Sequence, residues 1–305
     1  MIKRLITGAI MLSILLPLVI IDHYVCEVVY ACLAVVMATI AGCEFINKAS
    51  INNPKLAKVK VLCPLLSGVM CFLALNGTYQ SSDTGNYLYH MLTLLGLLVS
   101  CGVIFVRMLF VDESNANDIA NAVLGVVYCG LIFGYALSLR YFKPLNINRS
   151  FLEINGTKSF LFIYTIVIMT DTFAYLFGIK FGKRRLCPKI SPKKSVEGAI
   201  AGVVGGGLFG VLGLFGYQIF DSGTFKTFPE ILLVIIIGFV LSVVISCLVQ
   251  LGDLVESKLK RSYGVKDFGN LLPGHGGILD RFDSFLYSGF MFLSVMMIVE
   301  VCLGL

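Results

Sequence analysis

Long apolar runs recur along the whole chain and are separated by short polar segments. We place these runs near residues 5–22, 25–46, 60–78, 88–112, 117–139, 159–181, 196–219, 228–252 and 283–304. Each is roughly 17 to 25 residues long, enough to cross about 30 Å of hydrocarbon as a helix. The pattern predicts an all-α, polytopic membrane bundle of about nine spanning helices, plus or minus one.

Composition supports a membrane protein without a soluble domain. Of the 305 residues, 57% are hydrophobic and only 14% are charged, which is too much apolar surface for one water-soluble core. The longest polar stretches, about 20 to 30 residues, are shorter than an independent domain. We therefore expect one integrated membrane domain, with N-terminal helices in 1–158 and a catalytic region in 159–305. The first run lacks a small-residue cleavage pattern, so we expect it to be retained.

Loop cations predict the orientation. Lysines are concentrated between the second and third runs, whereas the segment 80–88 has no Lys or Arg. Cation-rich loops face the cytoplasm, and the alternation places the polar segments 182–195 and 257–283 on that side too. We expect a protein of the cell inner membrane with its chemistry-bearing loops in the cytoplasm. One loop disagrees, because four cations fall on the predicted outer face: Arg140, Lys143, Arg149 and Lys158.

The net charge of +6 is explained by these cytoplasmic loops and by attraction to anionic membrane lipids, and it gives no indication of nucleic acid. One structural pattern is a glycine stripe, Gly198, Gly202, Gly206 and Gly210, spaced four apart along one helix face. Such a stripe lets another helix approach closely. It could serve internal packing or the interface of a homodimer.

Asp171 lies near the middle of the run 159–181. A carboxylate in lipid costs at least about 2.5 kcal/mol, so we expect Asp171 to face the bundle interior. Tyr175 follows one turn later and shares that face. Together they could line a substrate cavity, although a protonated acid that holds two helices together is the alternative.

The segment 178–198 is rich in cations and contains Pro188 and Pro192, which prevent one continuous helix. We expect a short irregular loop ahead of a helix N-terminus, where anions are favoured. Ser191, Lys193 and Lys194 would then offer hydroxyl and ammonium donors to a triphosphate. An ordinary cation-rich cytoplasmic loop is the alternative.

Acidic residues in the last third of the chain suggest a metal. Asp253 and Glu256 are three apart and share a helix face, an arrangement that suits Mg²⁺ with water and substrate phosphate. The alternative is that these acids pair with Lys258 or Lys260. The segment 257–283 adds Asp267, Asp280 and Asp283 as oxygen ligands, and Lys266 and Arg281 as phosphate-binding cations. His275, between glycines, is a better candidate for orienting this loop than for acid–base chemistry.

The order of residues in this segment resembles a known family motif. It reads Ser257-x-Leu-Lys260-Arg261-x4-Lys266-Asp267-x-Gly269-x2-Leu272-Pro273-x-His275-Gly276-Gly277-Ile-x-Asp280-Arg281-Phe-Asp283. The sequence is similar to that of the phosphatidate cytidylyltransferases, also called CDP-diacylglycerol synthases. Three further segments also resemble that family: Asp171-Thr-Phe-Ala-Tyr175-x2-Gly178, Ser191-Pro-Lys-Lys194-Ser-x-Glu197-Gly198 and Gln250-Leu-Gly-Asp253-x2-Glu256-Ser257.

The resemblance implies that CTP and phosphatidate react to give CDP-diacylglycerol and pyrophosphate. By similarity, Asp253 and Asp267 would hold Mg²⁺, with K⁺ or another Mg²⁺ as a second cation. Ser191, Lys193 and Lys194 would grip CTP. Lys266 and Arg281 would neutralise lipid phosphate or departing pyrophosphate, and Asp171 and Tyr175 would line the floor of the lipid cavity.

Two other classes of function are compatible with the sequence. One is another CTP-dependent enzyme acting on membrane lipids, such as a CDP-archaeol synthase or a polyprenol kinase. The other is an ion-coupled transporter that uses Asp171 and the C-terminal acids, although the dense motifs in the polar loops favour an enzyme.

Overall fold

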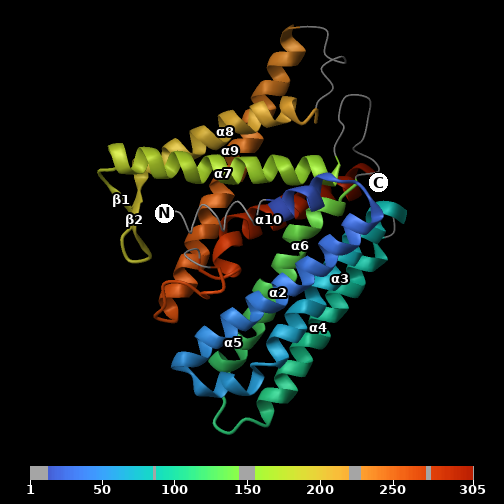
Figure 1. Ribbon diagram of the computed structural model, residues 1–305, viewed down its shortest axis with the longest axis vertical. Coiled ribbons are helices and arrows are strands. Elements are labelled where there is room, and N and C mark those ends of the chain that lie inside the picture. The colour runs from blue at the N-terminus through green and yellow to red at the C-terminus, as the bar shows by residue number, and fades with distance from the viewer. Residues whose placement is uncertain (1–12, 85–86, 144–154, 220–227, 273–275, 305) are drawn as a thin grey trace. The chain divides into compact units, whose positions relative to one another are not determined.

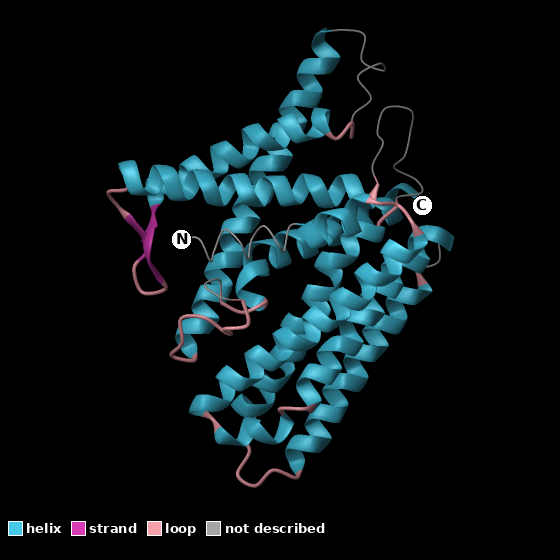
Figure 2. Ribbon diagram, in the orientation of Figure 1, coloured by secondary structure: helices cyan, strands magenta, loops and turns pink. Residues whose placement is uncertain are grey.

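The computed structural model describes residues 13–84, 87–143, 155–219, 228–272 and 276–304, which are mostly helical (Figures 1 and 2). The helices and strands are α2 (Tyr24–Asn52), η1 (Pro54–Val59), α3 (Leu62–Thr84), α4 (Leu88–Leu109), α5 (Ala116–Val126), η2 (Val127–Ile132), α6 (Phe133–Ser138), η3 (Leu139–Tyr141), α7 (Gly156–Phe181), β1 (Arg185–Cys187), β2 (Ser191–Ser195), α8 (Val196–Gly216), α9 (Phe228–Ser262) and α10 (Leu279–Gly304).

Eight helical segments within the described ranges are long and apolar enough to cross a membrane. They match eight of the nine predicted runs, and α5 to η3 together form one of them. The predicted first run, 5–22, begins outside the described residues, and its described part is helical over 13–20. The protein is therefore an all-α polytopic membrane protein, as predicted.

The chain forms two compact units. Unit 1 comprises Met1–Tyr141 with Lys260–Phe282, and unit 2 comprises Phe142–Leu259 with Asp283–Leu305. The C-terminal part of the chain thus contributes to both units. The functional division into 1–158 and 159–305 stays a prediction.

Within unit 1, α3 packs against α2, α4 and α6. Small residues allow the close approach: a Cβ added to Gly134 would lie 2.7 Å from the Cα of Cys71, and one added to Gly130 would lie 2.8 Å from the Cα of Ser67. Gly130 belongs to η2, a π-helical turn within the span 116–141. Bulky residues such as Phe45 and Phe133 fill the core between these helices.

The position of Arg140 shows that one part of the predicted topology is wrong. It was expected in an outer loop, but it lies in η3 and is only 2% exposed. Its guanidinium donates to the carbonyl oxygen of Ile21 at 3.1 Å and pairs with Asp22 at 3.5 Å. Arg140 therefore stabilises the packing of unit 1, and one of the four cations that conflicted with the predicted orientation is not a loop charge.

Within unit 2, the glycine stripe on α8 packs against α7 and α9. A Cβ added to Gly202 would lie 2.8 Å from the carbonyl oxygen of Thr170, and one added to Gly206 would overlap the hydroxyl groups of Thr170 and Ser246. Thr170 itself donates to Ser246 at 3.1 Å and so joins α7 to α9 beside the stripe. The internal-packing interpretation of the stripe is confirmed.

The proline-containing segment before α8 is more ordered than predicted. Instead of an irregular loop, β1 and β2 form an antiparallel hairpin in which Cys187 pairs with Ser191. Ser195 ends the hairpin and caps α8, accepting the N–H of Gly198 at 3.2 Å. Glu197 in the first turn of α8 accepts the backbone N–H of Lys183 at 3.0 Å. These contacts fix the hairpin against the start of α8.

Candidate active site

Polar side chains from four elements of unit 2 come together at one place. Asp171 on α7 interacts electrostatically with Asp253 on α9, Asp283 on α10 and Lys194 on β2. Lys194 Nζ forms an ion pair with Asp253 Oδ2. We call Asp171, Asp253 and Asp283 the carboxylate cluster. The sequence had suggested each of these four residues separately, and the structure brings them together.

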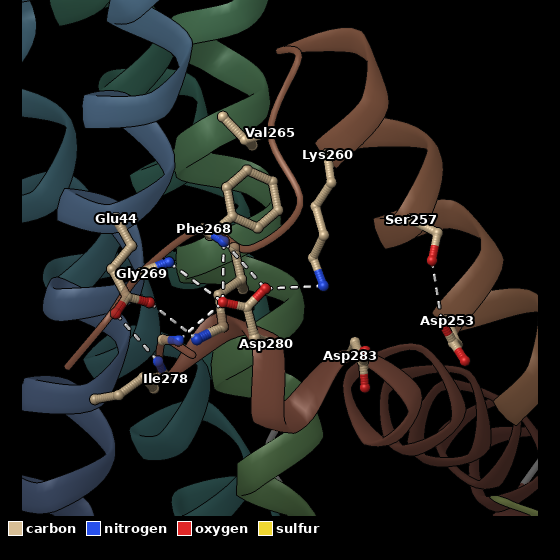
Figure 3. A network of polar contacts seen from close by, with 12 residues as sticks. Glu44, Asp253, Ser257, Lys260, Val265, Phe268, Gly269, Ile278, Asp280 and Asp283 are labelled. Carbon is tan, nitrogen blue, oxygen red and sulfur yellow. Dashed lines mark hydrogen bonds and ion pairs between the residues drawn. The ribbon is translucent and has the colours of Figure 1, made fainter. Parts of the chain in front are cut away.

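Two hydroxyl groups accompany the carboxylate cluster. Ser257 lies one turn after Asp253 on α9 and donates to Asp253 Oδ1 at 3.2 Å (Figure 3). Ser284 follows Asp283 on α10 and hydrogen-bonds to Asp171. Ser284 was not among the predicted site residues, although its place next to Asp283 in a polar helix start was a usable signal.

Helix packing sets the positions of these side chains. The Thr170–Ser246 hydrogen bond fixes α7 against α9 one residue before Asp171. Gln250 Nε2 donates to the carbonyl oxygen of Ala199 at 2.9 Å and joins α9 to α8. Gly252, next to Asp253, has no side chain, and a Cβ there would lie 3.1 Å from the carbonyl oxygen of Asp283. The backbones of α9 and α10 can therefore approach closely enough to bring their acids together.

The predicted site residues differ in how far their side chains are exposed to solvent. The side chain of Asp253 is 22% exposed and that of Lys194 is 31% exposed, so a ligand could reach both. Glu256, predicted to share a face with Asp253, is fully buried. Asp171 points towards the acids of α9 and α10, as an inward-facing acid should, and its side chain remains accessible there. Tyr175, expected on the same face, is exposed on α7.

The charges in this place favour a bound cation. Three carboxylates repel one another, and Lys194 supplies one positive charge against them. Among the residues that the structure describes, no three His, Cys, Asp or Glu side chains are close enough to form a ready-made metal site. Mg²⁺ usually takes only one or two protein carboxylates and completes its shell with water and substrate phosphate, so the donors fit that ion.

A second polar network lies in unit 1 and holds the described parts, 263–272 and 276–278, of the segment between α9 and α10, called here the α9–α10 loop. Asp280, in the first turn of α10, is 4% exposed. Its carboxylate accepts the N–H groups of Phe268 at 2.9 Å, Gly269 at 3.2 Å and Gly277 at 2.8 Å (Figure 3). Lys260 Nζ lies 2.8 Å from Asp280 Oδ1. Asp280 thus binds the backbone of its own loop.

Comparison with known proteins places the chain in a family. A family model described as "Cytidylyltransferase family" matches residues 2–299. The chain belongs to the cytidylyltransferase family. The family resemblance inferred from the motifs is thereby confirmed.

Several relatives with the more specific name phosphatidate cytidylyltransferase match more than half of this cytidylyltransferase. The phosphatidate cytidylyltransferase of Bacillus subtilis (strain 168) is 34% identical over 285 residues, 93% of each chain. The protein of the same name from Staphylococcus epidermidis (strain ATCC 35984) is 34% identical over 223 residues, 73% of this chain and 76% of its own. That from Staphylococcus aureus (strain COL) is 39% identical over 170 residues, 56% of each.

Other residues proposed for cytidylyl transfer have known positions but untested roles. Lys266 and Asp267 are exposed in the α9–α10 loop, and Arg281 is exposed in the first turn of α10. Ser191 is half-buried and Lys193 is exposed on β2. His275 lies outside the described residues. Catalytic or binding roles for all of these, and for Asp280, Asp283 and Tyr175, stay predictions.

Sequence reasoning missed Glu44 on α2. Its carboxylate accepts the backbone N–H groups of Ile278 and Leu279, where the α9–α10 loop enters α10. A signal was present, because Glu44 is an acid inside the apolar run 25–46. The argument applied to Asp171, that acids within spanning segments are costly and functional, applies equally to Glu44.

Proposed function

We propose that the protein transfers a cytidylyl group from CTP to phosphatidate and releases CDP-diacylglycerol and pyrophosphate for phospholipid synthesis. The observation that carries this proposal is the meeting of Lys194 with the carboxylate cluster in unit 2. Together, Lys194 supplies an ammonium group suited to phosphate, and the carboxylate cluster supplies oxygen ligands suited to a hard cation. Membership of the cytidylyltransferase family and the names of the relatives support the same reaction.

The β1–β2 hairpin binds the nucleotide in this proposal. Lys193 and Lys194 present ammonium groups and Ser191 a hydroxyl group on one strand, which ends at the N-terminus of α8. Ammonium groups and helix N-termini both stabilise phosphate oxygens. Lys194 pairs with Asp253 and stays partly exposed, so it can bind phosphate while it limits repulsion by Asp253.

The reaction joins two anions, and the protein must offset their repulsion. A phosphate oxygen of phosphatidate attacks the α-phosphorus of CTP, a new P–O bond forms, and the bond to the departing pyrophosphate breaks. Lys193 and Lys194 hold the nucleotide, and Lys266 and Arg281 are proposed to neutralise phosphate charge. The attacking oxygen is already anionic, so no side chain has to remove a proton from it, and His275 is assigned to orienting its loop.

Mg²⁺ is proposed as the cofactor. Asp253 would hold it, and Asp267 is the second carboxylate that the family motif suggests. When bound, Mg²⁺ supplies positive charge that stabilises phosphate oxygens in the transition state. Asp171 and Asp283 contribute further negative charge to the carboxylate cluster. A second cation, K⁺ or another Mg²⁺, would be held by the same electrostatic attraction.

Membrane placement follows from the two substrates. The acyl tails of phosphatidate stay in the bilayer, whereas CTP arrives from water. We propose that the protein lies in the cell inner membrane with the hairpin and the α9–α10 loop facing the cytoplasm. The cation-rich loops 48–60 and 182–195 support this orientation.

The test follows the fate of cytidine. Purified protein is incubated with Mg²⁺, phosphatidate and CTP labelled in the cytidine ring, and both lipid-bound label and pyrophosphate are measured. We expect label in the lipid in equal amount to pyrophosphate, and loss of both when EDTA removes the metal. A parallel incubation uses CTP labelled at the γ-phosphate. If that label enters lipid and cytidine does not, the protein is a kinase and the proposed transfer is refuted. Absence of any product from folded wild-type protein would also refute it.

A further inference from the structure

Glu44, in the N-terminal part of unit 1, forms hydrogen bonds with the backbone at the start of α10. It lies on α2 and is only 9% exposed. Its two carboxylate oxygens accept the N–H of Ile278 at 3.2 Å and the N–H of Leu279 at 3.1 Å (Figure 3). The first N–H groups of a helix have no partner within it, and a carboxylate is favoured there. Glu44 supplies that partner from more than 230 residues away in sequence.

Two glycines of the α9–α10 loop enclose the same carboxylate. A Cβ added to either Gly269 or Gly277 would overlap the oxygen atoms of Glu44. The two glycine backbones also meet each other, since a Cβ on Gly269 would lie 2.8 Å from the Cα of Gly277. The loop therefore closes around Glu44 without space for a larger residue at either position.

The neighbouring residue on α2 supports the same loop. The ring of Phe45 stacks on Phe268 with centroids 5.5 Å apart and makes an edge contact with Tyr263 at the same separation. Phe268 is also a residue whose N–H donates to Asp280. The loop backbone is thus held by Asp280 from within its own segment and by the pair Glu44–Phe45 from α2.

We infer that Glu44 is a positioning residue for the reaction. It acts through the backbone that it holds and not by contact with a substrate. It fixes the backbone of the loop that carries Lys266 and Asp267 and the helix start that carries Arg281. This inference rests on the proposed function, in which those three residues act on phosphates and metal.

The inference predicts which kinetic constant changes. The residues proposed to grip CTP lie on β2, which is part of unit 2, whereas Glu44 and the loop belong to unit 1. Loss of Glu44 should therefore lower kcat and leave the KM for CTP nearly unchanged. Glu44→Gln keeps the size and one accepting oxygen, so we expect kcat to fall about tenfold, and about 100-fold for Glu44→Ala, which removes both acceptors.

The first experiment combines kinetics with amide hydrogen exchange on the full-length protein in lipid. Glu27→Gln is the matched control, since Glu27 is an acid in the first turn of the same helix, away from the α9–α10 loop. We expect faster exchange at the amides of Ile278 and Leu279 in both Glu44 variants and in neither wild type nor control. Wild-type kcat in folded Glu44→Ala, or a lower kcat without faster exchange at these amides, would overturn the inference.

If Glu44→Ala fails to fold, a second experiment combines two substitutions that should compensate for each other, Gly277→Ala and Glu44→Asp. Gly277→Ala should lower kcat because its Cβ displaces the Glu44 carboxylate. Glu44→Asp withdraws that carboxylate by one methylene and makes room for the Cβ. We expect the kcat of the double variant to be at least several-fold higher than the value calculated by multiplying the two single reductions. A kcat equal to that calculated value would mean that the two substitutions act independently and would overturn the inference. An inactive wild type would refute the proposed function instead, while the exchange measurement would still report on Glu44.

Discussion

Replacing Gly206 with alanine is expected to destabilise unit 2. Gly206 is buried on α8, between Thr170 of α7 and Ser246 of α9. An added Cβ would overlap both hydroxyl groups and would lie 3.2 Å from the Cβ of Ser246. The methyl group can be accommodated only if the helices separate or the Thr170–Ser246 hydrogen bond breaks.

The magnitude follows from three contributions. Overpacking a well-packed core costs about 1–3 kcal/mol. Loss of the hydrogen bond between Thr170 and Ser246 adds about 0.6 kcal/mol, a typical value between membrane helices. The better helix propensity of alanine offsets up to about 1 kcal/mol. The free energy of unfolding should therefore fall by about 1–3 kcal/mol, which lowers the midpoint of thermal unfolding by several degrees.

The assay is thermal unfolding in detergent, followed by the loss of helical circular dichroism. Gly216→Ala is the control on the same helix, because no atom lies within 4 Å of a Cβ added there. Ser246→Ala removes one of the overlapping hydroxyl groups, so Gly206→Ala should cost less in that background. An unchanged midpoint for Gly206→Ala, or an equal fall for Gly216→Ala, would refute the packing argument.

Three further predictions concern the site and its surroundings. Asp253→Asn should lower kcat about 100-fold because it removes charge proposed to hold Mg²⁺, and wild-type turnover at normal Mg²⁺ would exclude that role. Lys193→Ala should raise the KM for CTP about fivefold, the effect of losing one exposed charge contact, and unchanged CTP kinetics would remove Lys193 from the site. Burial raises the pKa of Tyr263 to about 12, so its stabilising contribution is complete below the ordinary value of 10 and is lost as pH rises towards 12. Alkaline titration of unfolding should therefore show a smaller loss of stability between these pH values in Tyr263→Phe, and identical curves would contradict this.

Much of the fold could be predicted because membrane spans depend on local composition. The apolar runs placed the starts of the spanning helices from α2 to α10 within four residues, whereas α9 continues ten residues beyond its predicted end. The glycine stripe indicated close packing because its period matches a helix turn. The hairpin was missed because Pro188 and Pro192 show only that a helix is interrupted, and the pairing of Cys187 with Ser191 depends on Glu197 and Ser195 closing the segment against α8.

The candidate site was harder to predict because identical residue types occupy different environments. Asp280 and Asp283 are three apart in sequence, yet Asp280 is buried among backbone N–H groups while Asp283 interacts with Asp171. Burial and partners are set by packing between distant segments, which spacing along one helix does not reveal. Glu44 shows the same limit, since its partners Ile278 and Leu279 come from the opposite end of the chain.

The contact between Glu44 and the start of α10 also has a consequence for how the protein is made. During synthesis, α2 enters the membrane long before residues 278 and 279 exist, so Glu44 must wait without the two N–H groups that it accepts in the finished protein. The burial of a carboxylate without partners is costly. Unit 1 can therefore reach its final packing only after nearly the whole chain has been synthesised, and a polypeptide that stops before α10 leaves the Glu44 carboxylate without these two partners.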